Sequence, residues 1–75
     1  MYDRESKVIV LSGMDLTTGE ATGDVVVIDP RIPFATRATK HGMAIIYKNA
    51  MEEYVTDSGS AILAAKREAM ADTGI

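Results

Sequence analysis

The sequence contains no cysteine and no tryptophan, and it has one phenylalanine and one histidine among 75 residues. The missing cysteine excludes disulfides and thiolate metal sites. The single histidine, His41, has no second histidine to share a zinc ion, which argues against a structural zinc site. Because aromatic residues make up only 5 % of the chain, the core must come from Val, Ile, Leu, Ala and Met, which bury less area per residue.

Long apolar segments are also missing. The longest unbroken apolar runs have five residues, as in residues 43–47, whereas a membrane-spanning helix needs about 20. Residues 1–7 are polar, carry both signs of charge and lack the basic and apolar regions of a signal peptide. We therefore expect a protein of the cytoplasm, or of a particle assembled there, with no membrane contact.

The remaining composition is that of a folded protein, with 47 % hydrophobic and 25 % charged residues. We expect one small domain spanning residues 1–75. A domain of this size buries only about 60 % of the surface that its unfolded chain exposes, so it commonly depends on a disulfide, a metal or a partner. With the first two disfavoured, the sequence predicts association with other chains.

Residues 7–29 predict an antiparallel β-hairpin. Its two β-branched segments, residues 7–12 and 24–29, are joined by a turn in which Asp15 and Gly19 suit a type I turn followed by a G1 bulge. Gly23 indicates a second bulge. Both segments carry four consecutive aliphatic residues, so apolar side chains point to both faces of the ribbon. Either the chain's own helices wrap both faces, or a second chain covers one of them; we favour the second chain.

Two helices are predicted after the hairpin. Residues 30–42, which contain Pro30 and Pro33, are expected to form a stiff connector and the helix start. Apolar residues at helical spacing predict a helix over residues 43–57. A turn should follow, in which Asp57, Ser58 or Ser60 caps a last helix over residues 60–73; a continuous helix through Gly59 is the alternative.

The last helix should end at Gly74 in a left-handed conformation, with Ile75 touching Met70. The predicted fold class is therefore α+β: an N-terminal antiparallel hairpin followed by two helices, completed by oligomerisation.

Catalytic motifs are not found. His41 has no neighbouring carboxylate to orient it, and the serines have no nucleophile motif around them. The glycine spacings match neither phosphate-binding loop, and residues 15–20 lack the oxygen-ligand spacing of a calcium loop. We expect no enzyme, no cofactor, no metal and no small-molecule substrate.

Charge is unevenly distributed along the chain. Residues 1–30 hold six acids and two bases, whereas residues 31–48 hold four bases and no acid. Copies of the chain could pair electrostatically through these segments, or the two segments could neutralise each other within one fold. The basic segment also permits a second hypothesis, a dimeric nucleic-acid-binding regulator. A pI near 4.9 argues against it, because phosphate binding needs a net positive surface.

The function that we expect from the sequence is that of a non-catalytic structural subunit. It would associate with itself or with a larger complex, such as a virion or a multi-subunit assembly; a non-catalytic subunit of an enzyme complex is a further alternative. Arginines and lysine of the basic segment would set the orientation of the partners. The candidate interface residues are Val8, Val10, Val25, Val27, Ile45, Leu63, Met70, Arg31, Arg37 and Lys40.

Overall fold

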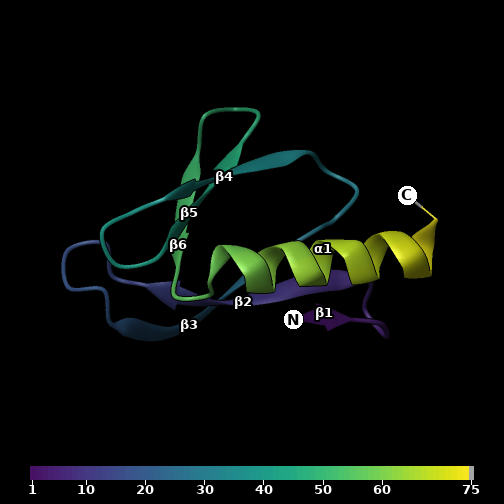
Figure 1. Ribbon diagram of the computed structural model, residues 1–75, viewed down its shortest axis with the longest axis horizontal. Coiled ribbons are helices and arrows are strands. Elements are labelled where there is room, and N and C mark those ends of the chain that lie inside the picture. The colour runs from purple at the N-terminus through teal and green to yellow at the C-terminus, as the bar shows by residue number, and fades with distance from the viewer. Residues whose placement is uncertain (75) are drawn as a thin grey trace.

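The computed structural model describes residues 1–74 and shows a small α+β domain with one antiparallel sheet and one C-terminal helix (Figure 1). The fold class predicted from the sequence is thus confirmed at this level. The elements in chain order are β1 (Tyr2–Asp3), β2 (Val8–Met14), β3 (Ala21–Ile28), β4 (Phe34–Ala38), β5 (Met43–Tyr47), β6 (Glu52–Val55) and α1 (Gly59–Thr73).

Strand β2 organises the sheet, because it pairs with three other strands. β3 lies along one edge of β2, whereas β1 pairs with the start of the other edge and β6 with its end, where Gly13 lies opposite Val55. β5 and β4 continue the sheet beyond β6. The sheet is therefore curled, and Figure 1 shows α1 lying along β2 while β5 and β6 rise away from the start of the helix.

The hairpin of β2 and β3 has the turn chemistry that the sequence predicts. Asp15 begins the turn and its carboxylate accepts the N–H of Thr17 at 2.8 Å. Gly19 has a φ of 77°, which a side chain would oppose. Gly23, with a φ of 87°, lies in the irregularity where the register shifts between Ser12 and Met14. The bulge predicted at Gly23 is therefore confirmed, and Gly19 has the positive φ that was predicted for it.

The predicted helix over residues 43–57 is wrong, because this segment forms the hairpin of β5 and β6. A short apolar run fits a buried strand as well as a helix, and residues 43–47 are such a run. The turn has no glycine to reveal it. Instead, Asn49 accepts the N–H of Met51 at 3.1 Å, and Ala50 adopts the left-handed conformation with a φ of 68°.

The connector and helix start predicted for residues 30–42 are also partly wrong. Residues 34–38 form β4, which pairs with β5 so that Thr36 lies opposite Ile45. An aromatic residue and a threonine at positions 34 and 36 favour a strand, and the partner strand was itself misassigned as a helix. With residues 43–57 assigned to a helix, residues 34–38 had no partner strand, so the second wrong prediction followed from the first.

Helix α1 starts one residue before the predicted helix over residues 60–73. Ser58 is the N-cap, and its hydroxyl accepts the N–H of Ala61 at 3.2 Å. The helix begins at Gly59, so the alternative of a helix continuous through Gly59 is wrong. Gly74 ends α1 with a φ of 74°, as predicted. The expected contact of Ile75 with Met70 lies outside the described residues.

The core lies between α1 and the inner face of the curled sheet. Ile62, Ala65 and Ala69 of α1 are buried, and alanines at two of these positions let the helix approach the strands closely. The side chains that are almost fully buried come from four strands; they are Ile9, Leu11, Ile28, Ile45 and Val55. Completion of the fold by oligomerisation stays a prediction.

Candidate interaction surface

The outer face of the first hairpin carries four valines that point away from α1. Val10 lies opposite Val27 in the ladder, Val25 lies opposite Ser12, and Val8 precedes Val10 by two residues, so all four share one face. Val25 is 65 % exposed and Val27 is 54 % exposed. We call Val8, Val10, Val25 and Val27 the valine face. The structure thus brings together the four hairpin residues that the sequence nominates for an interface.

The three other apolar candidates lie elsewhere. Ile45 is fully buried in β5, so its assignment to an interface is wrong; the assignment assumed a helix in which Ile45 shared the polar side. Leu63 and Met70 are each 47 % exposed on α1, which covers the opposite face of the sheet. They are therefore separate from the valine face.

The basic candidates are largely paired within the chain. Arg31 binds Asp29 through two nitrogen–oxygen contacts of 3.0 Å, and Arg37 contacts Glu52 at 2.6 Å. Hydrogen bonds from Arg31 lower the pKa of Asp29 below its ordinary value. Lys40 is exposed in the turn between β4 and β5. The basic segment is thus partly neutralised by its own fold.

His41 lies beside the turn of the first hairpin. A side chain at Gly19 would come within 2.5 Å of the β- and γ-carbons of His41, so the turn before β3 and the turn before β5 are in close contact. Within residues 1–74, His, Asp and Glu side chains form no group that could hold a metal ion.

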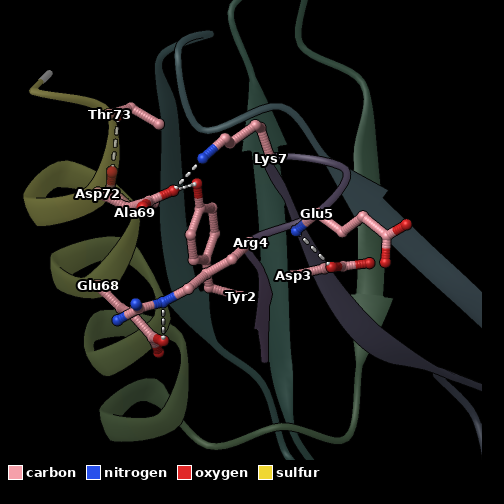
Figure 2. Close-up of polar contacts among 9 residues, drawn as sticks. All are labelled: Tyr2, Asp3, Arg4, Glu5, Lys7, Glu68, Ala69, Asp72 and Thr73. Atoms are coloured by element: carbon pink, nitrogen blue, oxygen red, sulfur yellow. Dashed lines mark hydrogen bonds and ion pairs between the residues drawn. The ribbon is translucent and has the colours of Figure 1, made fainter.

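A polar cluster, which sequence reasoning missed, joins the two ends of the chain (Figure 2). The Tyr2 hydroxyl and the Lys7 ammonium both donate to the same oxygen of Asp72, each at 2.7 Å, and Arg4 lies 3.5 Å from Glu68. The hydrogen bonds from Lys7 and Tyr2 lower the pKa of Asp72. Burial, helped by the bond to Asp72, raises the pKa of Tyr2 to about 12. These partners are about 70 positions apart, so no local pattern could reveal them.

A groove of about 480 Å³ lies beside this polar cluster. It is lined by Ser6, Lys7, Pro30, Arg31, Asp72 and Thr73. Its two cations are already paired, Lys7 with Asp72 and Arg31 with Asp29. Its two hydroxyl groups are also bound within the chain, since Ser6 donates to the carboxylate of Asp3 at 2.8 Å and Thr73 donates to the carbonyl oxygen of Ala69 at 2.7 Å. The groove therefore offers no evident chemistry.

The polar cluster predicts how stability depends on alkaline pH. An unfolded tyrosine ionises near pH 10, whereas the pKa of Tyr2 in the folded chain is about 12. Between these values the folded state holds the extra proton, so the free energy of unfolding should fall as the pH rises from 10 to 12. Tyr2→Phe should reduce this fall, as measured by urea unfolding at several pH values. Parallel pH profiles for the two proteins would contradict the assignment.

No helix within residues 1–74 is both long enough and apolar enough to cross a membrane. Comparison of the chain with protein-family models, with curated proteins and with solved structures finds no match.

Proposed function

We propose that the chain is a non-catalytic structural subunit that associates with itself, or with a larger assembly of which it is a part, through the valine face. One observation carries the proposal: four aliphatic side chains lie together on the outer face of the β2–β3 hairpin, and two of them are more than half exposed. Small proteins seldom leave contiguous apolar patches in water unless the patch binds a partner. The cytoplasm remains the expected location.

The outer face has the composition of an interface centre. Side chains of Val8, Val10, Val25 and Val27 carry no charge, and the acidic residues Asp15, Glu20, Asp24 and Asp29 lie before, between or after these valines in the hairpin. Interfaces typically combine an apolar centre without charges and a polar rim. A nucleic-acid-binding role is less well supported, because Arg31 and Arg37 are already bound by Asp29 and Glu52.

The test is the mass of the chain in solution. We expect the wild-type chain, measured by light scattering over a dilution series, to have a mass above that of one chain. Val10→Glu places a charge in the middle of the valine face and should lower this mass, because burying an unpaired carboxylate is costly. Val10→Thr keeps the β-branched shape and no charge, so it is the matched control.

Circular dichroism of each variant would establish that the fold is retained. A wild-type chain that is monomeric at every concentration would contradict the proposal. So would a folded Val10→Glu variant that keeps the wild-type mass.

A further inference from the structure

Strand β3 has an edge without a strand partner among residues 1–74. It pairs with β2 along one side only. An unpaired edge presents backbone N–H and C=O groups that can bind a strand of another chain.

The hydrogen bonds of β2 show which backbone groups of β3 point to this open edge. Val10 exchanges backbone bonds of 2.7 Å with Met1, and Ser12 donates to Asp57 and accepts from Thr56, so the peptide groups of both residues point away from β3. In an antiparallel pair, opposite residues exchange both bonds or neither. Val27 and Val25 lie opposite Val10 and Ser12. Their N–H and C=O groups therefore point to the open edge.

From these groups we propose that two copies of the chain pair antiparallel along β3, with Val26 on the two-fold axis. This inference rests on the self-association proposed above and adds to the valine face a second contact, formed by the backbone at the edge of β3. A two-fold axis through an antiparallel pair places one residue opposite its own copy. When that residue is Val26, Val25 lies opposite Val27 of the second copy, and they exchange both bonds. Every open backbone group of Val25 and Val27 is then satisfied.

Neighbouring registers are less favourable. An axis at Val27 would place Val25 opposite Asp29, whose carbonyl already accepts the N–H of Ile32 at 3.0 Å. An axis at Val25 would place Val27 opposite Gly23, which has a φ of 87° and belongs to the bulge. Only the register centred on Val26 uses the regular part of the strand on both copies.

Charge and side-chain positions agree with this register. Asp24 would lie opposite Ile28 of the second copy, so no carboxylate meets another directly. Residues 25–28 contain no lysine, arginine or proline, the residues that commonly protect edges from pairing. The edge strand β4, by contrast, follows Pro33 and carries Arg37. Pairing at β3 also joins the valine faces of the two copies into one continuous surface.

Cysteine cross-linking tests the register, and the absence of native cysteine makes single variants unambiguous. In the proposed dimer, Val26 and its copy form a pair without mutual hydrogen bonds, with α-carbons about 4.5 Å apart, which a disulfide can bridge. Val26→Cys should therefore form a covalent dimer under mild oxidation. Val25→Cys is the matched control, because it would lie roughly 8 Å from its own copy and should cross-link far less.

The edge hydrogen bonds are tested by proline. Val27→Pro removes an N–H that points outward and leaves the ladder with β2 intact, so the fold should persist. Two symmetric bonds would be lost, and the dissociation constant of the dimer should rise about tenfold or more. Val27→Thr keeps the N–H and the branched side chain, and it should dimerise like the wild type.

The outcomes separate this inference from the proposed function. If Val25→Cys cross-links as readily as Val26→Cys, or if Val27→Pro leaves dimerisation unchanged, the edge pairing is wrong although self-association stands. In a mixture of two variants, cross-linking of Val26→Cys to Thr36→Cys in β4 would likewise overturn it in favour of head-to-tail pairing. If Val26→Cys cross-links but Val10→Glu keeps the native mass, the edge pairing stands and the role of the valine face fails.

Discussion

Replacing Ile45 with alanine is expected to lower the free energy of unfolding by about 2–5 kcal/mol. Ile45 is fully buried in β5 and belongs to the core cluster with Ile9, Val55 and Ile62. A domain of this size has a total stability of roughly 4–11 kcal/mol at 0.05–0.15 kcal/mol per residue. The substitution should therefore remove a large share of the stability and leave a substantial unfolded population at physiological temperature.

Urea unfolding followed by circular dichroism would measure this effect, and Ile32→Ala is the matched control. Ile32 is 54 % exposed, so the same chemical change should alter the free energy of unfolding by less than about 0.5 kcal/mol. If both variants unfolded at the wild-type urea concentration, Ile45 would not be a core residue.

Replacing Gly42 with alanine should be the second strongly destabilising change. A β-carbon at position 42 would collide with the carbonyl oxygen of Val55 and would lie 2.7 Å from the sulfur of Met14. The collision is with backbone, so relief requires the turn before β5 to move away from the end of β6. Overpacking of this kind costs about 1–3 kcal/mol, and thermal unfolding should show it as a lower melting temperature.

Gly59→Ala provides the control for Gly42→Ala. At Gly59 a β-carbon would meet only the terminal carbon of Met43 at 3.6 Å and its sulfur at 3.9 Å, which are ordinary contacts. Gly59 is also the first residue of α1, where alanine is the better helix former. We expect this variant to be at least as stable as the wild type. Equal melting temperatures for Gly42→Ala and wild type would show that the turn can move freely.

The parts of the fold that the sequence predicted correctly are those specified by local chemistry. The first hairpin was predictable because Asp15 and Gly19 satisfy the backbone of its turn, and β-branched runs flank it. The ends of α1 were predictable because the Ser58 hydroxyl accepts a backbone N–H of the first turn, and Gly74 adopts the left-handed conformation that ends a helix. These residues act on atoms a few positions away, so one sequence suffices to find them.

The second half of the sheet was not predictable in this way. Residues 43–47 are apolar on both faces, and their helical or extended state depends on which partners bind their backbone. The partners are β4 and β6, and the turn between β5 and β6 uses Ala50 in a left-handed conformation where a glycine would have been recognisable. Without that signal, the spacing of Met43, Ile46 and Tyr47 favoured a helix.

For the candidate interface, the sequence by itself determined that the hairpin carries valines on both of its faces, because side chains alternate along a strand. Only the tertiary structure decided which face stays exposed. Helix α1 and the strands β5 and β6 cover Ile9, Leu11 and Ile28, and this leaves Val25 and Val27 in water. The packing of distant segments made that choice, and the open edge of β3 follows from the same arrangement.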